Sequence, residues 1–316
     1  MEIAVSLAGS MSIGNTMLLG TTNPVLQDLG FGARDRVVIV HADDLGMCHA
    51  TLPAFEELTE FGLVRSGSVM VPCPWFLEAA ALSNKQPAVD LGIHLTLTSE
   101  WPAYRWGPVS TRDPDSGLMD ERGFFHRRRQ SVVEHAALQA AFVELRAQVE
   151  TARRAGIDAT HLDCHMYTAL DTKFLPGYID LCIEEVLPGV VSRECWEGDV
   201  TTAVAGALSR WVEHRFPVFD RISVMGVLEP GFDRVDQARK VFDEFPNGLS
   251  CLLIHPAIDT PELRAITPDW SLRVADYQAF LSMELRSHLK HTGIQLIGYG
   301  QLRRFMRSRA TPSRTS

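Results

Sequence analysis

The chain has 316 residues, of which 46% are hydrophobic and 22% are charged, and its formal net charge is −9 at pH 7. This composition is typical of a soluble globular protein, and the negative charge argues against a protein that binds nucleic acid phosphates or anionic membranes. No stretch approaches the roughly 18 apolar residues of a membrane span. The length accommodates one large α/β domain or two ordinary domains.

The cysteines and the N-terminal segment predict a cytoplasmic location. Six cysteines are scattered without a C-x-x-C spacing, as is typical of reduced thiols. The first twenty or so residues include Glu2 but no Lys or Arg, so a secretory signal is not expected. We expect residues 1–33 to be a leader with a short helix, residues 34–308 a single catalytic domain, and residues 309–316 a disordered tail.

Predicted strands and helices alternate along most of the chain. A β-branched run at 37–40 is followed by apolar residues at helical spacing up to Phe61, with Gly62 as a C-cap. Further strands are predicted at 68–71, 91–95, 159–163, 189–192, 221–224, 250–255 and 294–299, and further helices at 75–82, 133–154, 174–185, 201–212, 235–242 and 275–290. Eight alternating units predict parallel strands in a closed or nearly closed (β/α) barrel, and a doubly wound open sheet is the alternative.

Residues 99–130 interrupt this alternation. They contain several aromatic residues, prolines and charges but little periodicity. A long irregular insertion in a compact α/β protein is often a substrate loop, and a disordered surface excursion is the alternative.

Polar side chains stand at the carboxyl ends of four predicted strands. In a parallel barrel these ends share one face, where active sites lie. The residues are Asp43 and Asp44 after the first strand, His94 in the third, His161, Asp163 and His165 at the fourth, and His255 at the seventh.

One carboxylate and two imidazoles form a natural ligand set for a catalytic divalent metal ion. We predict that Asp44, His94 and His165 bind one such ion, Zn²⁺ or Mg²⁺, and that the adjacent Asp43 acts as general base. Each residue alone has a plainer interpretation, since an Asp-Asp pair is often a solvated turn and a lone His is often a core residue. His255, before Pro256, is either a general acid or a structural histidine.

Five segments together resemble the YdjC-like carbohydrate deacetylases, a family that includes chitooligosaccharide deacetylases. These segments are HADDLG at 41–46, SGSVMVP at 66–72, LGIHLTLTSEW at 91–101, THLDCH at 160–165 and LLIHPA at 252–257. The resemblance implies a distorted (β/α) barrel like that of polysaccharide deacetylases. It also implies that Asp43 is the base, that Asp44, His94 and His165 bind the metal, and that His255 is the acid.

The chain departs from this family at three places. Many members have Asn at the position of His41, a further His near Tyr167 or Thr168, and Gly at the position of Ala257. Without the extra His the sugar-facing rim differs, so the substrate need not be a chitooligosaccharide. We expect the substrate to contact Trp101, Tyr104, Trp106, His161 and Asp163, although core packing would account equally well for each aromatic residue.

The predicted function is removal of an acetyl group from an N-acetylated sugar or oligosaccharide. A hydrolase of another bond, such as a phosphoester, is less favoured because the motif segments lack the Lys or Arg that phosphate requires. The third hypothesis is a sugar-binding or regulatory protein that keeps the site but does not catalyse a reaction. We expect a carbohydrate as partner and neither nucleic acid nor membrane, and a homo-oligomer is compatible with the sequence.

Overall fold

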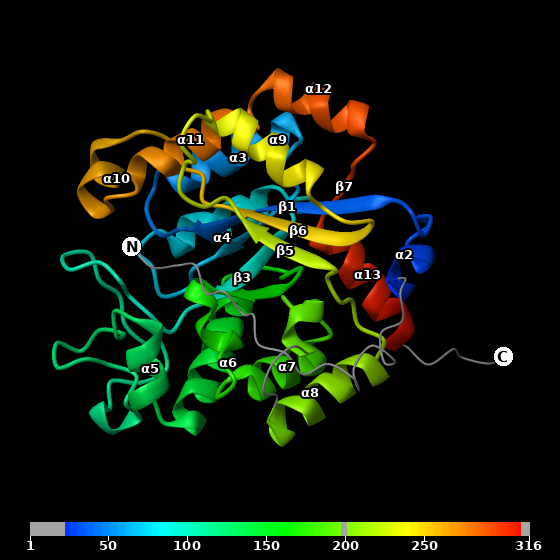
Figure 1. The fold of residues 1–316 in the computed structure, drawn as a ribbon. Helices are drawn as coiled ribbons and strands as arrows, with labels where there is room; N and C mark the ends of the chain where they lie inside the picture. The colour runs from blue at the N-terminus through cyan, green and yellow to red at the C-terminus, as the bar shows by residue number, and fades with distance from the viewer. Residues whose placement is uncertain (1–22, 197–200, 311–316) are drawn as a thin grey trace.

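The computed structural model describes residues 23–196 and 201–310, which are built around one parallel β-sheet (Figure 1). Within these residues the sheet has seven strands in the order β4-β3-β2-β1-β6-β5, with β7 also paired to β1. The strands are β1 (Arg36–Leu45), β2 (Ser66–Val69), β3 (Leu91–Leu95), β4 (Leu162–Cys164), β5 (Arg221–Val224), β6 (Gly248–Ile254) and β7 (Gln295–Ile297).

Strand β1 is the centre of this sheet. It pairs with β6 from Arg36 to Ala42 along one edge. Its other edge is shared, because β7 pairs with the first part of β1 and β2 pairs with the part from His41 onward. Every residue of β1 after Arg36 is buried, as expected for a strand covered on both faces.

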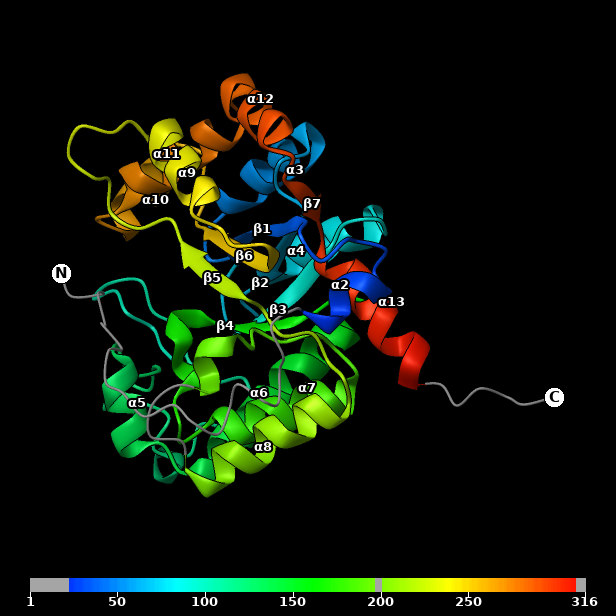
Figure 2. The ribbon, with the colours of Figure 1, turned by 45° about the vertical axis from the view of Figure 1, so that its right-hand side comes forward.

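Helices lie on both sides of the curved sheet (Figures 1 and 2). Helices α3, α9, α11 and α12 cover one side, and α6, α7 and α8 cover the other. This arrangement is a distorted, half-open (β/α) barrel, as the sequence predicts. The helices are α2 (Pro24–Asp28), α3 (Thr51–Phe61), α4 (Phe76–Lys85), α5 (Arg129–His135), α6 (Leu138–Arg154), α7 (Leu175–Glu185), α8 (Thr202–Glu213), α9 (Arg234–Asp243), α10 (Pro261–Ile266), α11 (Trp270–Phe280), α12 (Met283–Thr292) and α13 (Tyr299–Ala310), with short 3₁₀ helices η1 (Pro114–Ser116), η2 (His165–Leu170) and η3 (Arg193–Trp196).

The strand predicted at 189–192 does not form. This segment makes only single bridges, from Gly189 to Leu162 and from Ser192 to Phe219. The hydroxyl of Tyr178 lies between the two backbones, donating to Leu162 O (2.7 Å) and accepting the N–H of Val190 (2.7 Å). A side chain therefore takes the hydrogen bonds that a strand ladder would use, and the barrel stays open here.

Two predicted helices are each divided in two. The helix expected at 133–154 breaks between α5 and α6, where Ala136 and Ala137 are extended. Ala137 N–H bonds Ser116 O (2.9 Å), and Lys173 Nζ bonds Val133 O and Ala136 O at 2.6 and 2.7 Å. The helix expected at 275–290 breaks between α11 and α12. Ser282 caps α12 at this second break, and apolar periodicity reveals neither this cap nor the partners at the first break.

The predicted C-cap and the predicted short N-terminal helix agree with the structure, whereas two residues of the predicted tail are helical. Gly62 ends α3 with φ 89°, a conformation that glycine adopts without strain. Asn23 caps the short helix α2 through its side chain. Residues 309 and 310 belong to α13 rather than to a tail. The rest of the predicted tail and most of the predicted leader lie outside the described residues.

The insertion at 99–130 is a packed loop. Arg105 binds Asp120 Oδ2 (2.9 Å) and Phe125 O (2.6 Å), while Glu144 of α6 accepts the N–H groups of Val109 and Ser110.

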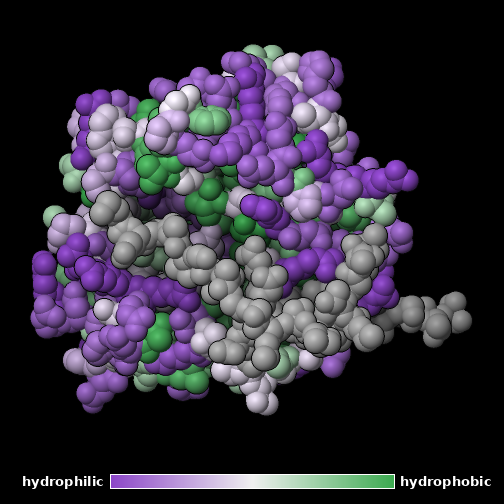
Figure 3. Space-filling view, viewed as in Figure 1, coloured by the Kyte–Doolittle hydropathy of each residue, from purple (hydrophilic) through white to green (hydrophobic). Residues whose placement is uncertain are grey.

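The face of the molecule in Figure 3 is mostly hydrophilic, with hydrophobic residues in small separate patches. Over the described ranges, every helix is too short or too polar to cross a membrane.

Candidate metal centre

The carboxyl ends of β1, β3, β4 and β6 bring the predicted site residues together. Asp43 and Asp44 lie near the end of β1, His94 lies in β3, and His165 directly follows β4. His255 directly follows β6. The parallel sheet places these ends at one edge, so residues up to 212 positions apart in sequence become neighbours.

A β-bulge aims the two aspartates. In the pairing of β1 with β2, Ala42 is opposite Gly67 and Leu45 is opposite Val69, so Asp43 and Asp44 together face a single residue. Asp44 also has φ 63°, in the left-handed region. Bulges and backbone strain of this kind concentrate at functional sites, where they redirect a side chain.

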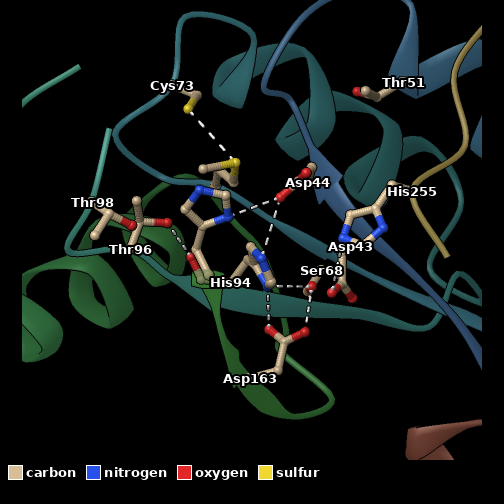
Figure 4. Close-up of polar contacts among 12 residues, drawn as sticks. Asp43, Asp44, Thr51, Ser68, Cys73, His94, Thr96, Thr98, Asp163 and His255 are labelled. Atoms are coloured by element: carbon tan, nitrogen blue, oxygen red, sulfur yellow. Dashed lines mark hydrogen bonds and ion pairs between the residues drawn. The ribbon is translucent and has the colours of Figure 1, made fainter. Parts of the chain in front are cut away.

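Asp44, His94 and His165 form a compact set of three donor atoms. Asp44 Oδ1 lies 3.1 Å from His165 Nδ1 and 3.4 Å from His94 Nε2. One ligand atom from each residue lies within 4.8 Å of the others, and all three residues are buried. Figure 4 shows His94 between Asp44 and Asp163.

Each of the three residues also contacts a charged side chain outside the set. His94 Nδ1 lies 3.0 Å from Asp163 Oδ1. His165 Nε2 lies 3.0 Å from Glu100 Oε2. Arg273 Nη1 binds the second oxygen of Asp44 at 2.9 Å. Metal-ligating side chains are usually oriented by such outer partners, so the arrangement fits a metal site.

The charges of the site also fit a divalent cation. The site contains four carboxyl groups, those of Asp43, Asp44, Asp163 and Glu100. Among the contacts described above, the permanent positive charge comes from Arg273. Buried like charges are costly without a compensating cation. Two imidazoles and one carboxylate are a ligand set typical of Zn²⁺ and accepted by other divalent ions.

Neighbouring charges shift the pKa values of Asp44, His94 and His165. Burial by itself would raise the pKa of Asp44, but Arg273 and His165 hold it well below its usual value. Burial would lower the pKa of both histidines, yet neighbouring carboxylates raise it, to about 9 for His165 and well above its ordinary value for His94. The imidazoles thus carry protons that a bound cation would displace.

Asp43 and His255 lie beside this set as a separate pair. His255 Nε2 is 3.8 Å from Asp43 Oδ2. Asp43 Oδ1 is buried and lies 3.2 Å from His41 Nε2, without a hydrogen-bond partner among the described residues. Burial raises the pKa of Asp43 to about 7 and lowers that of His255 to about 4. The backbone N–H of His255 donates to Asp276 Oδ2 (3.0 Å), which fixes the end of β6. His41 and His255 therefore contact different oxygens of the Asp43 carboxylate.

The surroundings of His161 and Asp163 differ from those expected of substrate-binding residues. His161 is fully buried and stacks on Tyr299 with ring centroids 3.9 Å apart. Asp163 is also buried, and its Oδ2 accepts from Ser68 Oγ (2.7 Å) and lies 2.9 Å from His41 Nε2. His161 is therefore a core residue, whereas Asp163 orients the polar groups behind the three donors.

The three aromatic residues of the loop pack on one another and on the site. Trp101 and Trp106 are 7% and 4% exposed, and their ring centroids are 5.5 Å apart. Trp106 also meets His165 edge-on at 6.2 Å. Tyr104 is half-buried and donates to Met47 O (2.5 Å). Packing accounts for the two tryptophans, and Tyr104 has more surface left for a ligand.

Several residues of the site were not predicted from the sequence. Glu100 lies within the segment 91–101 that carries the family resemblance, so this position could have identified it as a candidate site residue. Arg273 lies in α11 amid ordinary helical sequence and gave no signal. Met166 and Tyr167, directly after His165, have φ of 51° and 54°, a strained turn that only the structure reveals.

A half-open parallel (β/α) barrel with a buried His/Asp cluster at the carboxyl ends of its strands defines the class of this protein. The family model described as YdjC-like protein matches residues 37–291. The chain therefore belongs to the YdjC-like family.

Several curated relatives share most of the chain. A protein of Thermus thermophilus named carbohydrate deacetylase is 35% identical over 83% of this chain and 92% of its own length. Carbohydrate deacetylase 1 of Listeria innocua is 28% identical over 84% of this chain and 99% of its own. A solved structure from Enterococcus faecalis V583, described as a cellobiose-phosphate cleavage protein, has a TM-score of 0.70 at 21% identity and covers 85% of this chain and 99% of its own. That likeness shows the shared fold.

Proposed function

We propose that this protein hydrolyses the acetamide group of an N-acetylated carbohydrate, using a divalent metal ion held by Asp44, His94 and His165. The observation that carries the proposal is the convergence of these three donors beside Asp43 and His255. The names of the relatives supply the substrate class, since a chain 35% identical over most of its length is named carbohydrate deacetylase.

A divalent cation at these donors supplies a Lewis acid, which makes water a better nucleophile near neutral pH and polarises a carbonyl oxygen. Asp43 is the general base. Its Oδ1 lies 3.2 Å from His41 Nε2 but makes no hydrogen bond among the described residues, which supports a role in taking a proton from water. Burial raises the pKa of Asp43 to about 7, which makes its carboxylate a stronger base than an exposed aspartate.

His255 is the general acid that protonates the departing amine nitrogen. Its pKa is lowered to about 4 by burial, so the imidazole begins the reaction neutral. Asp43 Oδ2 lies 3.8 Å from His255 Nε2, and the negative charge that the substrate gains when water adds would favour transfer of the proton from Asp43 to this nitrogen. His255 then delivers the proton to the amine, which would otherwise be a very poor leaving group.

The ligand chemistry favours Zn²⁺ over Mg²⁺, because imidazole suits zinc whereas magnesium prefers oxygen ligands. A phosphoester substrate is less favoured, since Arg273 is buried and already paired with Asp44. A reducing, cytoplasmic location is supported by the buried free thiols of Cys48, Cys73, Cys164, Cys182 and Cys251.

The first experiment measures metal content and acetate release for the full chain on a panel of N-acetylated sugars. Expected results are about one divalent ion per chain and release of acetate that a chelator abolishes. Metal bound without acetate release from any sugar would favour a binding protein. Release of phosphate from sugar phosphates instead would favour the phosphoester hydrolase.

Single variants then separate the roles. Asp43→Asn should keep the metal but lose about 10²–10⁴-fold in kcat. His94→Ala and His165→Ala should lose the metal, and His291→Ala, an exposed histidine of α12, serves as the matched control. His255→Ala should lose more activity on a plain amide than on a substrate with an activated leaving group. Full activity of Asp43→Asn, or unchanged metal content of both ligand variants, would contradict the assignment.

A further inference from the structure

His165 is held at both ring nitrogens by carboxylates. Its Nδ1 lies 3.1 Å from Asp44 Oδ1, and its Nε2 lies 3.0 Å from Glu100 Oε2. An imidazole that binds a metal through Nδ1 carries its proton on Nε2, and Glu100 is placed to accept that proton in a hydrogen bond.

The two histidine ligands receive this support from different parts of the fold. His94 is held by Asp163, which belongs to strand β4 and is buried. His165 is held by Glu100, which belongs to the loop that follows β3 and whose side chain is 20% exposed. One support is thus built into the sheet, whereas the other depends on a loop.

The position of Glu100 is set by the far end of its own loop. Glu100 O accepts from Arg127 Nε at 2.8 Å, and the N–H of the preceding residue, Ser99, donates to His126 O at 3.0 Å. Ser99 Oγ in turn lies 3.2 Å from Arg105 Nε and accepts the N–H of Trp106 at 3.0 Å. The two ends of the loop are therefore tied together directly at the residue that contacts His165.

We propose that Glu100 is a positioning residue for the metal ligand His165, and that the loop of residues 99–130 thereby controls metal affinity. This inference rests on the metal site proposed above. Removal of an outer partner of a ligating histidine typically weakens metal binding 10- to 100-fold. Glu100 acts through His165 and does not itself bind the ion.

The test measures the dissociation constant of Zn²⁺ by chelator competition on the full chain. Glu100→Ala should weaken binding about 10- to 100-fold, and Glu100→Gln should weaken it less, because its amide oxygen still accepts the Nε2 hydrogen bond. Glu121→Ala and Glu121→Gln, at an exposed position of the same loop, are the matched controls and should leave the constant unchanged. Arg127→Ala, which frees the backbone of Glu100, should weaken binding by a smaller factor than Glu100→Ala.

A spectroscopic readout distinguishes positioning from ligation. With Co²⁺ in place of Zn²⁺, the visible bands of saturated Glu100→Gln should keep the wild-type positions. Bands shifted in Glu100→Gln would make Glu100 a ligand and overturn the inference, as would wild-type affinity in Glu100→Ala. If His165→Ala loses the metal while Glu100→Ala keeps it, only this inference fails. If the wild-type chain binds no divalent ion, the proposed function fails with it.

Discussion

Replacement of Gly92 by alanine should destabilise the protein through a clash with His161. Gly92 lies in β3, two residues before His94, and the ring of His161 fills the space where a side chain would stand. A Cβ atom on Gly92 would lie 2.6 Å from His161 Cδ2 and closer still to two other ring atoms. Carbon atoms in ordinary contact lie about 3.5–4.0 Å apart, so the ring would have to move by about 1 Å.

The ring of His161 has little room to make that movement. It stacks on Tyr299 at a centroid distance of 3.9 Å and an interplanar angle of 16°, and its edge meets His41 at 4.7 Å. All three rings are fully buried. Overpacking of a well-packed core costs about 1–3 kcal/mol, and we expect a loss of about 3 kcal/mol because the ring is confined on both sides.

The assay is urea unfolding of Gly92→Ala, His161→Ala and the double variant. His161→Ala alone should cost on the order of 2–4 kcal/mol, since it leaves a cavity. In its absence the new methyl group has space, so the double variant should be about 2–3 kcal/mol more stable than the sum of the single losses predicts. Losses that add to within about 0.5 kcal/mol would refute the steric explanation.

Three further predictions concern the site and its supports. Trp106→Ala should lower the free energy of unfolding by about 3–5 kcal/mol in urea, because the side chain is buried; a raised KM with unchanged stability would point to sugar contact instead. Arg273→Met should cost about 3–5 kcal/mol in the metal-free protein and less with saturating Zn²⁺, because a cation would replace the lost charge beside Asp44; equal losses would contradict this. Burial raises the pKa of Asp276 to about 6, against about 3.9 unfolded, so the folded state binds the proton more tightly. Wild-type stability should therefore fall relative to Asp276→Asn by about 2 kcal/mol as pH rises from 4 to 6, and a pH-independent difference in urea unfolding would contradict it.

The class of fold was predictable because its evidence is local and repeated. Apolar runs of strand length alternate with helical periodicity, and this alternation alone favours parallel pairing. The predicted strands at 91–95 and 221–224 coincide with β3 and β5. The failures occurred where one distant side chain decides the outcome, as where the Tyr178 hydroxyl replaces the ladder at 189–192 or Lys173 ends α5.

The candidate ligands were predictable for a similar reason. Asp44, His94 and His165 each follow or end an apolar strand, and the parallel topology brings such positions to one edge of the sheet. The roles of His161 and Asp163 were not predictable, because the alternating residues of the segment 159–165 look alike in sequence. Only the packing of His161 against Tyr299 separates a core ring from a polar residue that faces the site.

The sequence by itself determined the alternation of strands and helices, the strand ends that carry acidic and imidazole groups, and the resemblance to the YdjC-like family. The tertiary structure alone decided which atoms of those groups face one another. It placed Arg273 on Asp44 and Glu100 on His165, and it formed the bulge at which Asp43 and Asp44 together oppose a single residue of β2. The physical reason is that the sequence specifies which side chains are present. The orientation of each side chain and the charge balance around it depend on partners that folding brings from distant segments.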